Sequence, residues 1–182
     1  MNRKVKLSLL VLLLIFILVL TGCFGNTNVN EGRAQNHSVE LIEGFERFEN
    51  DYFEIQFDNR WTQDATELME MQVIAFLSPD GLATVNVIRE EMPIRYNLEQ
   101  YKNVSLQNAR QMHGRNMGET TEERTTVNGL DAYKITYDLT QRGLTNEIIQ
   151  VLIVCERTAF VISFAGNDED TFNKMLDTFV IK

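Results

Sequence analysis

Between residues 125 and 165 the chain consists of strand-forming runs separated by short turns. Asn128-Gly129 and Arg142-Gly143 mark two of these turns, and Asn-Gly is a strong signal for the tight turn of a β-hairpin. The run between them alternates apolar and polar residues, which is the period of a half-buried strand. Its apolar positions are Tyr133, Ile135, Tyr137 and Leu139. Because tight hairpin turns join antiparallel strands, this part of the chain predicts an antiparallel sheet.

Further strands are predicted on both sides of this segment. The runs 148–155 and 158–165 are apolar and bounded by short polar stretches, so they predict two more strands. Earlier in the chain, Phe53, Ile55 and Phe57 alternate with polar residues, and Trp61 closes that strand. The runs 71–78 and 82–89 predict a hairpin, and Pro79-Asp80-Gly81 forms its turn.

Two helices are predicted from apolar residues at steps of three and four. The first carries Leu98, Tyr101, Ser105, Ala109 and Met112 on one side. The second, capped by Asn167 or Asp168, carries Phe172, Met175, Leu176 and Phe179. The predicted order is β-β-β-α-β-β-β-α. This order implies an α+β fold, in which helices cover an antiparallel sheet within a single domain of residues 51–182.

Three segments of this domain resemble the PsbP-like fold family. They are the strand Tyr52–Phe57 followed by Trp61, the turn Val127–Ala132 before a long strand, and Phe160–Phe164 leading into the closing helix. The resemblance covers about residues 50 to 182 and implies an α/β sandwich. That family includes extracytoplasmic bacterial lipoproteins and photosynthetic accessory proteins, so the resemblance implies an accessory or adaptor role. It assigns no metal-binding or ligand-binding residue to this sequence.

The N-terminus resembles a bacterial lipoprotein signal. Three basic residues, Arg3, Lys4 and Lys6, precede the uncharged run 7–20, which ends in the lipobox Leu20-Thr21-Gly22-Cys23. The run is shorter than the roughly 20 residues of a membrane span and suits a signal peptide better than the alternative, a retained anchor. We expect residues 1–22 to be removed between Gly22 and Cys23, and a diacylglyceryl group to be attached to the Cys23 thiol.

The expected mature chain is a lipid-anchored protein on the extracytoplasmic face of the cell membrane. Residues 23–50 would form the lipidated cysteine and a flexible tether, within which apolar residues 39–48 suggest a short docking helix. Cleavage removes three of the 17 basic and none of the 26 acidic residues, so 14 basic residues remain and the net charge becomes −12. This charge disfavours nucleic acid as a partner. We expect an envelope protein as partner.

Several residue groups invite a metal-site hypothesis, but each has a simpler structural interpretation. Met69–Met71 with Met112, His113 and Met117 contains soft-metal ligands, yet Met112 lies on the helix stripe and core packing is favoured. His113 is expected as a cationic ring at a helix C-terminus. Two groups of carboxylates could suggest a calcium site, but they are expected at a helix N-terminus, or in a solvated loop or at a strand edge. They are Asp168, Glu169 and Asp170, and Glu119, Glu122 and Glu123.

The sequence contains no motif that indicates catalysis or a cofactor. With Cys23 lipidated, Cys155 is the remaining cysteine, and its apolar strand predicts an inert core thiol. No nucleophile elbow or phosphate-binding loop is present. We therefore expect no catalytic residue, no metal and no cofactor, and a non-catalytic protein-interaction or accessory module. The alternative is a lipoprotein that binds a small ligand or a metal, with a pocket near Trp61 or Tyr133; an enzyme ranks third.

Overall fold

The computed structural model describes residues 39–68 and 71–182. The signal segment, the lipobox with Gly22 and Cys23, and tether residues up to 38 lie outside the described residues. The described helices are α2 (Leu98–His113), the short 3-10 helix η1 (Gly114–Asn116) and α3 (Glu169–Asp177). None of these helices is long and apolar enough to cross a membrane. The strands are β1 (Phe45–Glu49), β2 (Phe53–Asp58), β3 (Thr62–Leu68), β4 (Met71–Leu77), β5 (Thr84–Glu91), β6 (Met117–Val127), β7 (Leu130–Gln141), β8 (Leu144–Cys155), β9 (Thr158–Ala165) and β10 (Val180–Ile181).

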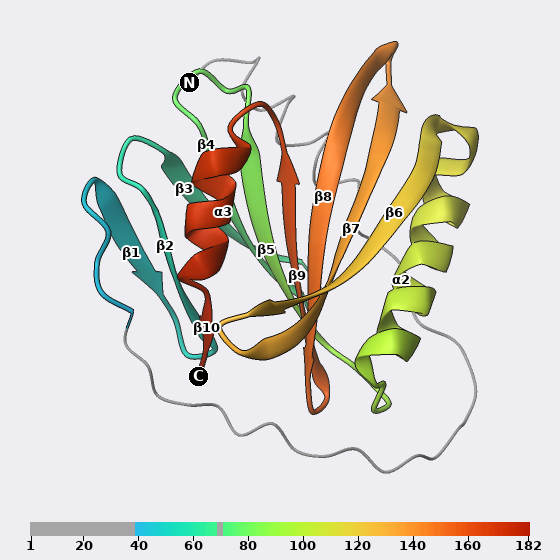
Figure 1. The fold of residues 1–182 in the computed structure, drawn as a ribbon, viewed down its shortest axis with the longest axis horizontal. Helices are drawn as coiled ribbons and strands as arrows, with labels where there is room; N and C mark the ends of the chain where they lie inside the picture. Colours follow the sequence, from blue (N-terminus) through green and yellow to red (C-terminus); the bar gives the residue numbers. More distant parts are fainter. Residues whose placement is uncertain (1–38, 69–70) are drawn as a thin grey trace.

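A seven-stranded antiparallel sheet in the order β3-β4-β5-β9-β8-β7-β6 forms the centre of the domain (Figure 1). The predicted tight turns are confirmed: Asn128-Gly129 and Arg142-Gly143 both have two consecutive residues with positive φ, from 47° to 81°. That geometry matches the right-handed twist of the strands they join. The predicted antiparallel α+β fold with helices on the sheet is therefore confirmed.

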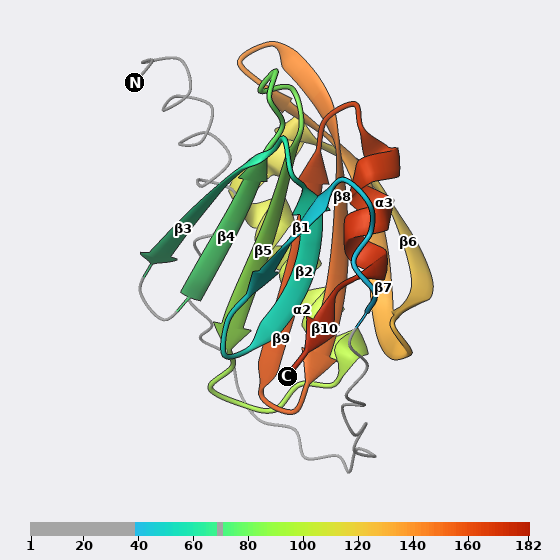
Figure 2. The ribbon, with the colours of Figure 1, turned by 90° about the vertical axis from the view of Figure 1, so that its left-hand side faces the viewer.

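A second sheet, β1-β2-β10, packs together with α3 on one face of the large sheet (Figures 1 and 2). The space between them is filled by apolar side chains, many of them phenylalanines. Phe53 lies at its centre, with ring centroids 6.0 Å from Phe160 and 5.4 Å from Phe179. Trp61 is also buried in this core. We call this side of the large sheet the aromatic face.

Helix α2 packs on the opposite face of the large sheet, over β6, β7 and β8, and we call this side the α2 face. A capping box begins the helix, because the Asn97 side chain accepts from the Gln100 amide and the Gln100 side chain accepts from the Asn97 amide. The core beneath it is smaller and includes Tyr101, Leu106 and Ile135. The large sheet is thus covered on both faces, by different elements.

The structure corrects several predicted element boundaries. Residues 45–49, expected in the tether or a short helix, form strand β1, and Phe48 packs its ring against Phe53 and Phe76. The three-residue spacing of Phe45 and Phe48 indicated a helix, but pairing with β2 overrides it. Strands β3 and β10 were not predicted, and β6 begins at Met117, whereas the strand-forming runs were predicted from residue 125 onward. These segments are polar or short, so their periodicity is weak.

Candidate functional site

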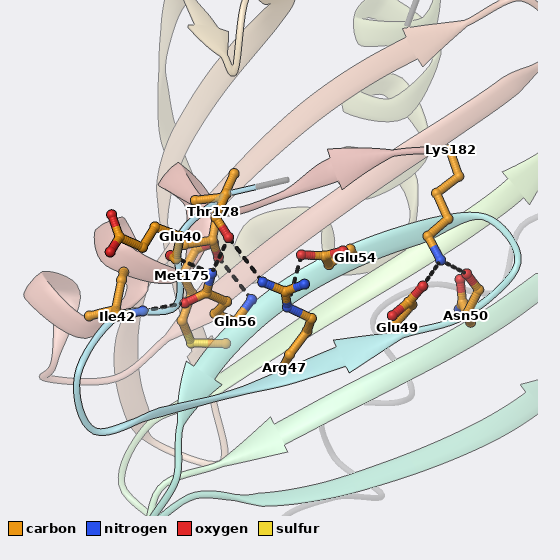
Figure 3. A network of polar contacts seen from close by, with 11 residues as sticks. Glu40, Ile42, Arg47, Glu49, Asn50, Glu54, Gln56, Met175, Thr178 and Lys182 are labelled. Atoms are coloured by element: carbon orange, nitrogen blue, oxygen red, sulfur yellow. Dashed lines mark hydrogen bonds and ion pairs between the residues drawn. The ribbon is translucent and has the colours of Figure 1, made fainter. Parts of the chain in front are cut away.

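A polar network joins the entry segment of the domain to its C-terminal helix (Figure 3). The side chain of Gln56, on β2, is fully buried. Its Oε1 accepts from the Ile42 amide at 2.8 Å, and its Nε2 donates to the Glu40 carbonyl at 2.9 Å. The Gln56 amide donates to Thr178 Oγ1 at 2.8 Å, and that hydroxyl donates to the Met175 carbonyl at 2.7 Å. This network, which we call the entry clamp, binds residues 39–42 to the fold.

Ion pairs extend the entry clamp along β1 and β2. Arg47 Nε lies 3.1 Å from Glu54 Oε1, and Arg47 Nη2 donates to the Val39 carbonyl at 3.0 Å. At the other end of β1, Lys182 Nζ lies 2.5 Å from Glu49 Oε1. The segment 39–50, which we predicted as tether, is therefore held against the domain over its whole length.

The entry clamp was missed by reasoning from the sequence. Gln56 alternates with apolar residues on β2, and that pattern predicts a side chain facing water. Its burial depends on residues 39–42, which lie at least fourteen positions earlier in the chain. A buried amide needs partners for its donor and acceptor groups, and the passing backbone supplies them. The residues next to Gln56 in the sequence do not predict such a contact.

A charged cluster lies between α2 and strands β6 and β7. Lys102 is nearly buried, and its Nζ lies 2.7 Å from Glu99 Oε1 and 2.8 Å from Glu122 Oε2. Hydrogen bonds, above all with Glu122, raise the pKa of Lys102 to about 12. The same ammonium lies 4.5 Å from the centre of the Tyr133 ring, whose hydroxyl donates to Glu99. In these contacts the Lys102 ammonium is paired with two carboxylates, and the contacts hold α2 on the sheet.

The two aromatic residues expected near a pocket lie on opposite faces of the large sheet. Trp61 belongs to the core on the aromatic face, whereas Tyr133 packs against the core beneath α2. They do not line one common site. The Lys102 ammonium lies over the ring of Tyr133, and the Tyr133 hydroxyl donates to Glu99. Tyr133 is therefore part of the charged cluster.

The α2 face also buries polar groups outside this cluster. Tyr101 donates to Glu90 Oε2 at 2.8 Å, and burial raises the pKa of Glu90. Some side chains here bury polar atoms that have no hydrogen-bond partner among the described residues, among them the Tyr137 hydroxyl and His113 Nε2. Burial raises the pKa of Tyr137 to about 12, so this phenol remains neutral.

His113 ends α2, as predicted, but its expected charge is wrong. Burial lowers the pKa of its imidazole below the ordinary 6.5, so the ring is neutral at pH 7. Desolvation thus outweighs the attraction of the helix C-terminus for a cation. Of the proposed soft-metal ligands, Met117 packs on the core beneath α2 and Met112 is partly buried. Met69 and Glu70 lie outside the described residues, and the side chain of Met71 is not described.

Three of the six carboxylates that invited a metal-site hypothesis, Asp168, Glu169 and Glu122, have a structural partner among the described residues. Asp168 caps α3 by accepting from the Thr171 amide at 3.2 Å, and Glu169 lies 3.2 Å from Lys134 Nζ. Glu122 pairs with Lys102, and its strand β6 is an edge of the large sheet, as expected for these glutamates. Within residues 39–68 and 71–182, no group of three or more His, Cys, Asp and Glu side chains is placed to hold a metal.

Cys155 ends strand β8 and is half-buried against the core of the aromatic face. Burial raises the pKa of its thiol above the ordinary 9.0, so the reactive thiolate is disfavoured at neutral pH. This environment agrees with the predicted inert thiol.

Comparison with known proteins identifies the fold. No protein-family model and no curated protein matches the chain. Among solved structures, the cyanobacterial PsbP protein CyanoP from Synechocystis sp. PCC 6803 superposes with a TM-score of 0.61 at 11% identity, over 78% of this chain and 95% of CyanoP. A protein from Bacteroides thetaiotaomicron superposes with a TM-score of 0.51 at 12% identity, over 78% of this chain and 49% of that protein. LpqN, described as involved in cell envelope biogenesis of Mycobacterium tuberculosis, gives 0.43 at 16% identity, over 71% of this chain and 83% of LpqN.

The domain therefore has a PsbP-like α+β fold, in agreement with the resemblance found in the sequence. The match spans nearly all of CyanoP, so it extends to the whole architecture and not to one hairpin. At 11% identity the likeness establishes the fold alone.

Proposed function

We propose that the chain is a lipid-anchored protein of the cell envelope whose PsbP-like domain acts as a non-catalytic protein-interaction or accessory module. The observation that carries the anchor is the lipobox Leu20-Thr21-Gly22-Cys23 after a basic and then apolar segment. Two or more acyl chains on Cys23 bind a membrane stably, whereas a single chain binds only marginally. The domain would then act at the extracytoplasmic surface.

The proposed accessory role draws on the chemistry of the described side chains. Three side chains that could act in catalysis or metal binding have structural roles or are unreactive. Asp168 caps a helix, Lys102 is paired with Glu122, and burial raises the pKa of the Cys155 thiol, which therefore stays protonated at neutral pH. The PsbP-like fold of CyanoP also suits a domain that acts by binding, although fold likeness gives this only as an analogy. We propose an envelope protein as the partner.

Crosslinking in living cells tests this proposal directly. The full chain and a Cys23→Ala variant are expressed in a bacterial host, crosslinked, and fractionated into membrane and soluble parts. We expect only the wild type to be lipidated, anchored and recovered with one partner protein in near-stoichiometric amount. Identical processing and localisation of Cys23→Ala would contradict the anchor, and an anchored wild type that is recovered alone would contradict the interaction role.

A small-ligand role is the second candidate, and one observation favours it. Tyr137 is almost completely buried, yet its hydroxyl has no partner among the described residues. The chain passes from the last turn of α2 through η1 to Met117, which pairs with Leu139 on β7. Leu139 lies two residues after Tyr137, and both face the core beneath α2. His113, with its unpartnered Nε2, therefore ends its helix close to this part of β7. Native mass spectrometry of the purified wild type tests whether a small molecule accompanies these groups.

A further inference from the structure

One end of the domain brings together three connections that are distant in the sequence. The Arg89 guanidinium, near the end of β5, lies 3.7 Å from the centre of the Tyr52 ring, next to the β1–β2 turn. Three residues after Arg89, the Met92 amide donates to the Arg157 carbonyl at 2.7 Å, and Arg157 Nη2 donates to the Pro93 carbonyl at 2.9 Å. We call this the Tyr52 end. Its three connections are residues 50–52, 92–97 and 156–157.

The exposed side chains at the Tyr52 end are those that suit a lipid–water interface. Tyr52 is 39% exposed and Ile94 is 38% exposed, and both are large apolar side chains. Arg95 and Arg157 are exposed beside them. Tyrosine is enriched at membrane interfaces, and arginine extends an apolar stem while its guanidinium reaches lipid phosphates. The acidic side chains in these three connections are Asp51 and Glu156, and the two arginines offset them. The exposed Glu49 and Glu91 at the adjoining strand ends are paired with Lys182 and Arg89.

The first described residues, 39–44, run along β2 in a direction set by their hydrogen bonds. The Gly44 carbonyl accepts from the Asn59 amide at 3.0 Å, beyond the far end of β2, whereas Glu40 is bound to Gln56 midway along that strand. Traced backwards from Gly44 to Val39, the chain therefore runs along β2 toward the Tyr52 end (Figure 2). The entry clamp fixes this direction at the beginning of the described chain.

We propose that the Tyr52 end rests on the phospholipid headgroups of the membrane to which Cys23 anchors the chain. This inference rests on the proposed function, because it requires the anchor. A tethered domain experiences an effective concentration of the membrane surface in the millimolar range, so a weak contact is enough to orient it. Tyr52 and Ile94 enter the interface, and Arg95 and Arg157 bind lipid phosphate. The phosphate belongs to the bilayer and not to a soluble ligand.

The opposite end of the domain differs in its charged surroundings. Leu82 and Leu144 are 64% and 70% exposed at its hairpins. Asp80 accompanies Leu82 in the same turn, and Asp138 and Glu147 form a facing pair on the hairpin that carries Leu144. The exposed Arg142 lies in the same turn as Leu144, so these three carboxylates outnumber this one guanidinium. These carboxylates are repelled by anionic headgroups, so this end points away from the bilayer. It is then the end that an envelope protein reaches from the aqueous side.

Spin labels at the two ends test this orientation on the full-length lipidated protein. The protein is reconstituted into vesicles of phosphatidylethanolamine and phosphatidylglycerol, in a Cys155→Ala background. One nitroxide is placed at Ile94→Cys and, in a separate sample, one at Leu144→Cys, which are both exposed positions. Power saturation with a water-soluble nickel chelate measures how freely each label meets water. We expect a loss of nickel accessibility at position 94 relative to position 144.

A charge-reversal variant supplies the matched control. For this control the nitroxide is placed at Tyr52→Cys. In the Cys155→Ala background, we expect this label to be protected from the nickel chelate. Adding Ile94→Asp and Arg95→Glu is expected to remove that protection. Leu144→Asp is expected to keep that protection. Equal nickel accessibility at positions 94 and 144, or protection of 144 alone, overturns the proposed orientation. Vesicle flotation separates the two proposals, because a protein that does not float lacks the anchor itself, whereas one that floats without protection at 94 is anchored but not oriented.

Discussion

The two faces of the large sheet are built from the same strands but have different interiors. On the aromatic face, phenylalanines from β2, β9 and the segment after α3 pack against one another, and Phe160 and Phe179 have ring centroids 5.5 Å apart. On the α2 face, Tyr101 and Lys102 are buried among the apolar side chains, and the half-buried Glu90 accepts a hydrogen bond from Tyr101. The aromatic face gains stability mainly from apolar burial, whereas the α2 face depends on specific polar partners.

The covering elements explain this difference. The β1-β2-β10 sheet and α3 present Phe53, Phe172 and Phe179, which fill space without polar partners. The buried positions of α2 are Tyr101, Lys102 and Leu106, so only one of them is aliphatic. Tyr101 and Lys102 bind carboxylates of β5 and β6, and these contacts set the position of the helix on the sheet. Helix α2 is therefore expected to respond to pH and to single polar changes more than the aromatic core does.

The largest expected effect is on the aromatic face. Phe160→Ala removes a ring that contacts both Phe53 and Phe179, and we expect it to lower the free energy of unfolding by about 3–5 kcal/mol. Val161, the next residue on β9, points to the α2 face and is equally buried. Val161→Ala removes less volume and is expected to cost less. Urea denaturation of both variants measures the difference, and a larger loss for Val161→Ala would contradict the proposed division between the faces.

A pair of tyrosines tests the polar partners of the α2 face. Tyr101 and Tyr137 are both 2% exposed, but only the Tyr101 hydroxyl has a partner among the described residues. Tyr101→Phe leaves the half-buried Glu90 carboxylate without its donor, and we expect a loss of about 1–3 kcal/mol. Tyr137→Phe removes an unpartnered hydroxyl and is expected to stay within about 0.5 kcal/mol of the wild type or to stabilise it. Thermal unfolding distinguishes them; a large loss for Tyr137→Phe would instead favour a bound small molecule at that hydroxyl.

The elements defined by strong local patterns were predictable from the sequence. The alternation of β7, the Asn128-Gly129 turn and the apolar stripe of α3 place those elements correctly, because turn geometry and side-chain period are local properties. Strand β1 and the burial of Gln56 were not predictable in this way. Both depend on contacts between segments distant in the sequence, such as Phe48 with Phe76, and these contacts override the local pattern. The predicted charge of His113 was also wrong, because burial of the ring lowers its pKa and the sequence alone did not reveal that burial.

A smaller effect is expected from Glu90, whose pKa is raised mainly by burial and is lowered only in part by its bond to Tyr101. In the folded protein the protonated form is favoured relative to the unfolded chain. This contribution to stability is fully present below the ordinary pKa of 4.5 and is lost as the pH rises through the raised value. Glu90→Gln keeps an acceptor for Tyr101 but does not titrate, so we expect it to be more stable than the wild type at neutral pH. Unfolding measured across acidic to neutral pH checks that this advantage disappears in acid; a constant difference would contradict the assignment.

The smallest expected effect has the opposite dependence on pH and comes from the same face. Burial lowers the pKa of His113 below 6.5, so the folded protein favours the neutral ring. Its contribution to stability is present above pH 6.5 and is lost as the pH falls from there through the lowered value. His113→Gln removes this titration, so we expect the variant to lose less stability than the wild type between about pH 7 and about pH 5. Hydrogen exchange in the last turn of α2 measures the effect locally. An unchanged pH dependence in the variant would show that the His113 ring is solvated in the folded and the unfolded protein alike. The α2 face would then have only the pH response of Glu90.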